Sequence, residues 1–223
     1  STVITIGDLK VGFIGVNTPE TQTKANPALI KGLKWLAGED MIKAVNAEAA
    51  ALKDKADVVV VLSHLGVDSE SKPNRSTDLW AGLKGVDFII DGHSHSVMTA
   101  GEGNEPIQST GTAMANIGVI TIDNASKKIV DNSLVKYTEF AKPDETVLAK
   151  AKELMKPVDD ELNVVFAKSE VDLNGTKGDD KGAIGNRNGE TNLGDLITDA
   201  MLWKAMNDIN LNVDRRNVVA ITN

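Results

Sequence analysis

The chain contains no cysteine, only three histidines and no long apolar run. Disulfides therefore contribute nothing to the fold, and the redox compartment cannot be read from cysteine usage. No apolar stretch approaches the length that spans a bilayer, so the sequence predicts no transmembrane segment. Both ends of the chain have strand-like sequence, so we expect an interior piece of a longer protein, in which a missing leader carries no information.

Positive charge is scarcer than negative charge, with 24 Lys and Arg against 32 Asp and Glu and a net charge of −8. An acidic protein repels the nucleic-acid backbone and anionic membranes, so neither is predicted as a partner. A small anionic ligand would need a local positive site, such as a metal ion. With 223 residues and 41% hydrophobic content, the chain is long enough for one large or two small cores.

All three histidines follow two similar apolar stretches. Residues 57–63 form a run of β-branched side chains that leads into His64, and residues 86–90 repeat the pattern and lead into a polar loop with His93 and His95. Within these stretches, residues 58–62 and 88–90 do not alternate with polar residues, which is typical of strands covered on both faces in a parallel sheet. Two parallel strands that end in histidine-bearing loops are therefore predicted.

Between these strands, residues 76–83 have polar residues able to cap a helix, followed by apolar ones, which completes a β-α-β unit. The carboxyl ends of its two strands lie at one edge of the sheet, so His64 should meet His93 and His95 there. Imidazole is a common ligand of divalent transition metals, and a His-x-His pair can serve one ion or two adjacent ions. A metal site is predicted, although a single loop histidine is more often solvated surface.

The rest of the first part reads as an α/β domain with a mixed sheet. The sequence predicts a hairpin from 3–6 and 9–16, a helix over 40–56 that packs on the sheet, and three short strands at 106–109, 118–122 and 134–137. The close spacing of those three strands favours antiparallel edge strands over further β-α-β units.

The second part begins with a predicted helix from Glu145 to about Leu162, which Pro157 interrupts or bends. A strand is expected at 164–167, and a further helix is expected with Asn192 as its N-cap. Arg187 lies just ahead of that helix, where its guanidinium and free backbone N–H groups could both face a phosphate.

Four separated stretches resemble the 5'-nucleotidase family of binuclear metallophosphoesterases, in the order that the family has them. Two are the histidine motifs, Val-Val-Leu-Ser-His-Leu-Gly at 60–66 and Gly-Val-Asp-Phe-Ile-Ile-Asp-Gly-His-Ser-His at 85–95. Residues 11–20 resemble the strand and loop that follow the family's catalytic motif, and residues 187–201 resemble the opening of its C-terminal nucleotide-binding domain. The resemblance covers most of the chain.

The resemblance implies an α/β fold, namely the second half of a metallophosphoesterase α/β/β/α sandwich with a mixed sheet, followed by a linker helix and the start of an α+β domain. The implied boundaries are 1–142 for the metallophosphoesterase part, 143–162 for the linker helix and 163–223 for the start of the C-terminal domain.

The resemblance also implies a hydrolase that removes phosphate from nucleotides with two divalent metal ions, of which Zn, Mn, Mg, Fe and Co are all candidates. His64 and His93 match ligands of one metal, His95 matches a position that supplies a ligand to the other, and Arg187 matches a substrate-contacting position. Cyclic 2',3'-nucleotides and UDP-sugars are further candidate substrates. The family places such enzymes outside the cell, on its surface or in the periplasm.

The departures from the family pattern are as informative as the matches. The family's Asp-x-His motif, its bridging Asp and its Gly-Asn-His-Glu/Asp motif are absent, and three histidines leave no room for them. The family's base-binding aromatic pair would follow Asn223. No catalytic residue is therefore predicted in this chain, which we expect to be inactive alone and to need the missing N-terminal half as its partner.

Two other interpretations stay open. The chain could be a non-catalytic binding or surface interaction module on the same fold, which predicts no metal at the histidines. It could also be an ordinary doubly wound domain with incidental histidines, which predicts that the three rings lie far apart.

Overall fold

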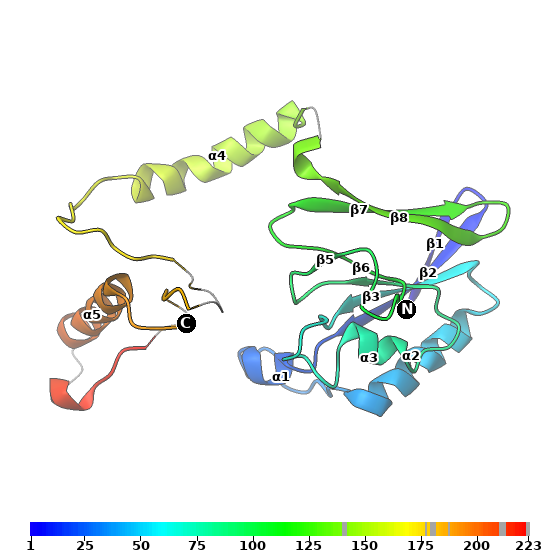
Figure 1. The fold of residues 1–223 in the computed structure, drawn as a ribbon, viewed down its shortest axis with the longest axis horizontal. Helices are drawn as coiled ribbons and strands as arrows, with labels where there is room; N and C mark the ends of the chain where they lie inside the picture. The colour runs from blue at the N-terminus through cyan, green and yellow to red at the C-terminus, as the bar shows by residue number, and fades with distance from the viewer. Residues whose placement is uncertain (140–141, 177, 179–181, 187, 210–212, 222–223) are drawn as a thin grey trace. The chain divides into compact units, whose positions relative to one another are not determined.

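The computed structural model describes residues 1–223 except 140–141, 177, 179–181, 187, 210–212 and 222–223 (Figure 1). The chain divides into two compact units, Ser1–Asp144 and Glu145–Asn223. The assignment of these units to family domains stays a prediction. None of the described helices is long and apolar enough to cross a lipid bilayer.

The first unit is built on a six-stranded sheet with the order β1-β2-β3-β4-β6-β5. Its strands are β1 (Thr2–Ile6), β2 (Leu9–Asn17), β3 (Val58–His64), β4 (Phe88–Asp91), β5 (Val97–Met98) and β6 (Ile107–Thr110). Strands β2, β3, β4 and β6 are parallel, whereas β1 and β5 pair antiparallel with β2 and β6. The predicted mixed sheet and its first hairpin are thus confirmed.

The prediction for the strand near residue 107 was wrong in its direction. Strand β6 lies parallel to β4, with Ile89 opposite Ile107. The chain turns back through the two-residue strand β5 before it enters β6, and this extra reversal restores the parallel direction. A strand of two residues gives too weak a pattern to be found in the sequence.

Helices cover one face of the sheet, as Figure 1 shows below the strands. Helix α2 (Gly38–Leu52) buries an apolar stripe that recurs every three or four residues, and the shorter α3 (Ser76–Trp80) adds Leu79. The stripe and the sheet face beneath it form one core, which contains Met41, Val45, Ala49, Leu52, Ile14, Val59, Val61, Leu79, Ile89 and Ile107.

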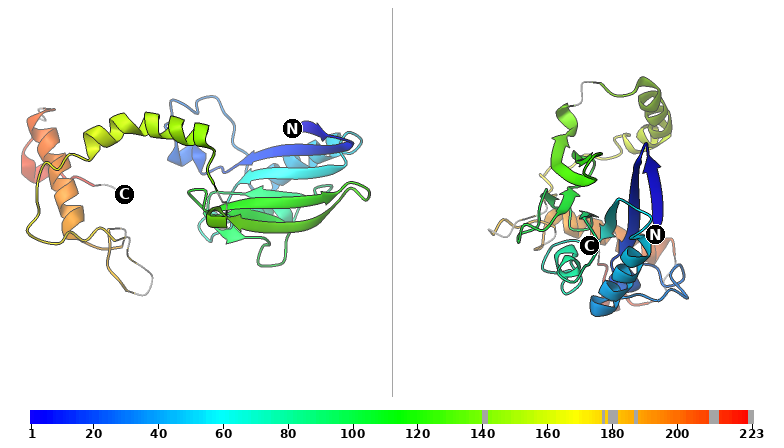
Figure 2. Two further views of the ribbon diagram at one scale, coloured as in Figure 1. Left: turned by 90° about the horizontal axis from the view of Figure 1, so that it is seen from above. Right: turned by 90° about the vertical axis from the view of Figure 1, so that its right-hand side faces the viewer.

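A two-stranded antiparallel sheet covers the opposite face. It consists of β7 (Asn116–Asp123) and β8 (Lys128–Lys136), and the views in Figure 2 place it beside the main sheet. The second core contains Val11, Val58, Val60 and Phe88 from the main sheet and Ile120, Ile122 and Ile129 from the small one. Successive residues of β3 therefore point into different cores, which explains why this strand has no polar alternation.

The second unit has two long helices, α4 (Glu145–Leu162) and α5 (Asn192–Asn207). Helix α4 has the predicted bounds and continues through Pro157. The strand predicted at 164–167 is absent from the described residues, where Phe166 is 97% exposed. A strand needs a partner for its backbone hydrogen bonds, and no strand of the described residues pairs with this segment.

The N-cap of α5 also differs from the prediction. The side chain of Thr191, rather than Asn192, accepts a hydrogen bond from the backbone N–H of Gly194. Asn192 instead binds the preceding loop, where its side chain accepts from the N–H of Asn174 and donates to the carbonyl of Asp172. Either residue type can cap a helix, and the loop contacts decide between them.

Candidate metal site at the sheet edge

The carboxyl ends of β3 and β4 bring two of the three histidines together. His64 is the last residue of β3, and His93 follows β4 by two residues. Because these strands are parallel neighbours, their ends lie at one edge of the sheet. The ring centroids of His64 and His93 are 5.1 Å apart, and the ring planes meet at 61°. His64 and His93 therefore lie next to each other, as expected from the sequence.

The carboxylate of Asp91 ties these loops to each other. Asp91 is the last residue of β4 and is only 7% exposed. Its Oδ1 accepts hydrogen bonds from the backbone N–H groups of Leu65 and Gly66, at 3.2 and 3.3 Å. One buried acceptor for two backbone donors fixes the path of the chain after His64.

Each loop has a glycine that lies close to the imidazole of the other loop. A β-carbon at Gly66, whose φ is +77°, would lie 3.2 Å from Cδ2 of His93. A β-carbon at Gly92 would lie 3.1 Å from Nδ1 of His64. His93 itself has a φ of 84°, in the left-handed region that non-glycine residues seldom adopt. Such a backbone conformation persists only where surrounding contacts fix it. The close packing of Gly66 against the His93 ring is one such contact.

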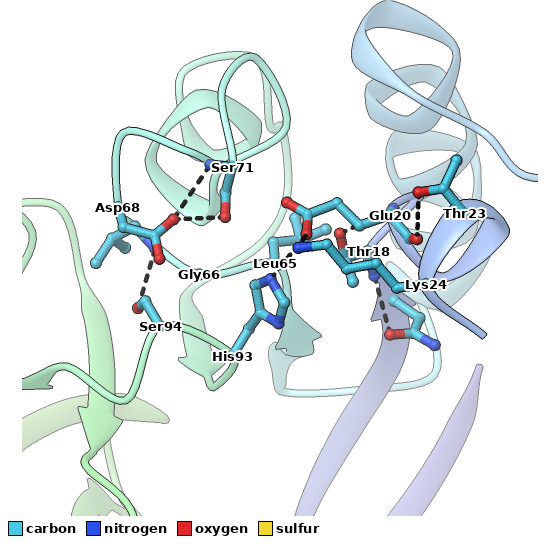
Figure 3. A network of polar contacts seen from close by, with 12 residues as sticks. Thr18, Glu20, Thr23, Lys24, Leu65, Gly66, Asp68, Ser71, His93 and Ser94 are labelled. Carbon is cyan, nitrogen blue, oxygen red and sulfur yellow. Dashed lines mark hydrogen bonds and ion pairs between the residues drawn. The ribbon is translucent and has the colours of Figure 1, made fainter. Parts of the chain in front are cut away.

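A third segment reaches the pair from β2. Glu20, in the loop after β2, has its Oε2 3.4 Å from Nε2 of His93, and Lys24 donates a hydrogen bond to the same oxygen (Figure 3). Together with Thr18, Thr21 and Ala25, these side chains and His64 line one open hollow. The pKa of Glu20 lies below its usual value, chiefly because Lys24 donates this hydrogen bond, with His93 acting in the same direction. The carboxylate is therefore ionised at neutral pH.

The third predicted ligand, His95, lies in the same loop as His93 but is exposed and also has a positive φ of 55°. Within the described ranges, no three His, Asp or Glu side chains form a cluster able to hold a metal ion. The assignment of His95 as a ligand therefore stays a prediction. Arg187 lies outside the described residues, and its predicted contact with substrate also stays a prediction.

The donor set at this edge fits a divalent ion in part. Two neighbouring imidazoles are the nitrogen ligands that Zn, Mn, Fe and Co accept, and a carboxylate lies beside them. Two protein ligands are fewer than the three or four that metal sites in enzymes have. If an ion bound at this edge, the described residues would fill only part of its coordination shell.

Two side chains of this site, Glu20 and Asp91, have no role that sequence patterns predict. Glu20 lies more than forty residues before His64 in the chain, and no local pattern connects them. Asp91 was visible in the Asp-Gly-His stretch, but its bonds to residues 65 and 66 depend on the pairing of β3 with β4. Only the folded sheet places either residue at the site.

Comparison with known proteins gives relatives of one kind, although no protein-family model matches the chain. An apyrase of Aedes albopictus is 32% identical over 127 residues, which are 56% of this chain and 21% of that protein. The trifunctional nucleotide phosphoesterase protein YfkN of Bacillus subtilis is 24% identical over 208 residues, which are 88% of this chain and 13% of that protein. A 5'-nucleotidase of Diplobatis ommata is 24% identical over 91% of this chain and 36% of that protein. The chain thus spans between 13% and 36% of the length of these relatives.

Solved structures agree on the fold. The calcineurin-like phosphoesterase YfkN of Bacillus subtilis superposes with a TM-score of 0.55 at 21% identity, over 70% of this chain and 54% of that chain. The sulfate thiohydrolase SoxB of Thermus thermophilus gives a TM-score of 0.58 at 19% identity, over 95% of this chain and 36% of that chain. The predicted fold class is confirmed. A phosphoesterase and a sulfate thiohydrolase share it, so the fold alone does not determine the substrate.

Proposed function

We propose, since this chain is related to the 5'-nucleotidase family of metallophosphoesterases, that it forms part of a metal-dependent phosphohydrolase that removes phosphate from nucleotides. The observation that carries the proposal is the meeting of His64 and His93 at the carboxyl edge of the parallel sheet. Open α/β sheets bind their ligands at this edge. The substrate class follows from the relatives, which are an apyrase, a nucleotide phosphoesterase and a 5'-nucleotidase.

In this proposal, His64 and His93 hold one divalent ion and His95 gives a ligand to a second. When bound, two such ions neutralise the charge of a phosphate group and activate water for attack on phosphorus. In this proposal the remaining ligands come from the N-terminal half that the family resemblance implies. That half corresponds to the partner predicted from the sequence.

The finer assignments are proposals that follow from the same relationship. Arg187 contacts the substrate, residues 1–142 belong to the metallophosphoesterase domain, and residues 163–223 open a nucleotide-binding domain. The protein acts outside the cytoplasm. Cyclic nucleotides and nucleotide sugars are candidate substrates beside nucleoside monophosphates.

Metal titration and a phosphate-release assay test the proposal together. The 223-residue chain is titrated with Zn²⁺ and Mn²⁺ by calorimetry and is then incubated with adenosine monophosphate and either metal. We expect measurable metal binding, because two imidazoles are already adjacent, and no phosphate release above the rate in buffer, because the shell is incomplete. Replacement of either residue of the pair, His64→Ala or His93→Ala, should weaken binding by about tenfold or more.

His95→Ala is the matched control, because it removes the third imidazole without touching the His64–His93 pair. In the isolated chain, His95→Ala should change the dissociation constant of the first metal ion by less than His64→Ala or His93→Ala does. Robust turnover that disappears in His64→Ala would contradict the inactivity of the isolated chain. Absence of metal binding by the unchanged chain would contradict the metal assignment.

A second candidate function is a non-catalytic binding module on the same fold. It predicts that metal ions bind the unchanged chain no better than they bind the chain with His64→Ala and His93→Ala combined.

A further inference from the structure

We propose that Glu20 is a positioning residue for His93: its carboxylate holds Nε2 of the imidazole, which leaves Nδ1 as the nitrogen that faces a metal ion. The binding of a metal ion rests on the proposed function. The contact between Glu20 and the His93 ring does not depend on that function.

The backbone ahead of Glu20 is fixed by its own polar side chains. Oδ1 of Asn17 accepts a hydrogen bond from the N–H of Thr18 at 2.9 Å, and Oγ1 of Thr18 accepts one from the N–H of Glu20 at 3.2 Å. Thr18 is buried, at 5% exposure. The four-residue helix α1 (Thr21–Lys24) then begins directly after Glu20. Glu20 is therefore presented from a defined turn rather than from a free loop.

The carboxylate of Glu20 is held in turn by Lys24, which donates to the same Oε2 that faces His93. The oxygen lies between an ammonium group and an imidazole, as Figure 3 shows. Its distance to Nε2 of His93, 3.4 Å, is slightly longer than an ordinary hydrogen bond.

The chemistry of the ring assigns the two nitrogens. A neutral imidazole has one N–H donor and one lone pair, and a carboxylate can only accept. If Glu20 accepts from Nε2, the lone pair is on Nδ1, and Nδ1 is the nitrogen available to a metal ion. Metal-binding histidines commonly donate their other N–H to a carboxylate, which fixes the ring and makes it a stronger ligand.

A comparison within the chain separates this arrangement from an ordinary surface ion pair. Glu39 and Lys43 on α2 also form an i,i+4 pair, with 3.5 Å between their charged atoms. The side chain of Glu39 is 88% exposed, whereas those of Glu20 and His93 are only 22% and 23% exposed. Glu20 thus has a partner beyond its helical neighbour, and that partner is the imidazole already paired with His64.

The test uses the full chain and reads the His93 ring directly by ¹⁵N NMR, first without metal and then with Zn²⁺. Variants are Glu20→Ala and Glu20→Gln, and the matched control is Glu39→Ala. Without metal, we expect His93 in the unchanged chain to carry its proton on Nε2 with slowed exchange. Glu20→Ala should give mixed tautomers and fast exchange, Glu20→Gln should keep part of the preference through its amide oxygen, and Glu39→Ala should change nothing.

With Zn²⁺, we expect coordination through Nδ1 of His93 in the unchanged chain and a dissociation constant about 10 to 100 times higher in Glu20→Ala. A His93 ring whose tautomer and exchange are identical in the unchanged chain and in Glu20→Ala would overturn the positioning role, as would coordination through Nε2. If the ring responds to Glu20→Ala but the unchanged chain binds no Zn²⁺, the positioning role stands and the proposed metal-dependent function fails.

Discussion

Asp91 is the residue on which the geometry of the histidine pair depends most directly. Its Oδ1 is the acceptor for two backbone N–H groups of the loop that follows His64, and the residue is almost completely buried. Its other oxygen, Oδ2, is buried without a hydrogen-bond partner among the described residues. The carboxylate thus stabilises the loop at the cost of a partly unsatisfied group.

We predict that Asp91→Ala lowers the free energy of unfolding by about 1 to 3 kcal/mol, because it leaves two buried N–H groups without an acceptor. Urea denaturation followed by tryptophan fluorescence measures the loss. Asp91→Asn keeps one carbonyl acceptor and should cost less. Equal losses in the two variants would show that the charge, rather than the acceptor, is what the loop needs.

At this scale, the residues that sequence patterns could predict were those next to strand ends. His64 ends β3 and His93 follows β4 by two residues, so their meeting could be predicted from the rule that parallel neighbours end at one edge. Glu20 was visible in the sequence but had no assignable role, because its contact with His93 joins segments that are distant in the chain.

Among the elements, α3 illustrates how a short helix is held at its start. Asp78 accepts from the backbone N–H of Arg75 at 3.1 Å and forms two bonds with the guanidinium, at 3.0 and 2.7 Å. The hydrogen bonds from the Arg75 side chain hold the pKa of Asp78 below its usual value. A helix of five residues has little stability of its own, so this contact and the burial of Leu79 fix it.

We predict that Asp78→Asn lowers stability at neutral pH by about 0.5 to 1 kcal/mol, a modest value because the pair is partly exposed. A carboxyl whose pKa is lowered by folding stabilises above its unfolded pKa, near 4, and loses this contribution as the pH falls through the folded pKa. Urea unfolding at several pH values should therefore show that the difference in free energy of unfolding between the unchanged chain and Asp78→Asn becomes smaller in acid. A constant difference across the pH range would contradict the ion pair, and Arg75→Met should reproduce the neutral-pH loss.

Elements were predicted best where they are long and periodic. Helix α2 and strand β3 have one buried stripe or one continuous apolar run, and their bounds differ from the prediction by a few residues. The direction of β6 was not predictable, because it depends on β5, whose two residues have no periodicity to read.

At the scale of the first unit, the two sheets are joined by a buried polar contact as well as by apolar packing. Gln108 of β6 is 2% exposed, and its Nε2 donates to the carbonyl of Ser133 at 3.1 Å and to the side chain of Asn132 on β8. Its side chain passes over Gly118 of β7, where an added β-carbon would lie 1.8 Å from Oε1 of Gln108. A side chain at position 118 would therefore require the side chain of Gln108 to move.

We predict that Gly118→Ala destabilises the first unit, because the new methyl group meets the side chain of Gln108. In a chain that also has Gln108→Ala, the Gln108 side chain is gone and most of this destabilisation should disappear. Urea denaturation of the two single variants and the double variant forms a double-mutant cycle, with an expected coupling of about 0.5 to 3 kcal/mol. Gly15→Ala in β2 is the matched control, since no atom lies within 4 Å of its added β-carbon. Additive effects in the cycle would contradict the contact.

The sequence by itself determined the identity of the two buried strands, the helix that covers them, the position of the histidines at their ends and the resemblance to metallophosphoesterases. These features are local, since they depend on side-chain periodicity and on residues adjacent in the chain. Only the tertiary structure decided which side chains share the site, namely that Glu20 and Asp91 contact the loops of His93 and His64 while His95 stays exposed. The physical reason is that hydrogen bonds between distant segments depend on strand pairing and loop conformation, which leave no periodic signal in the sequence.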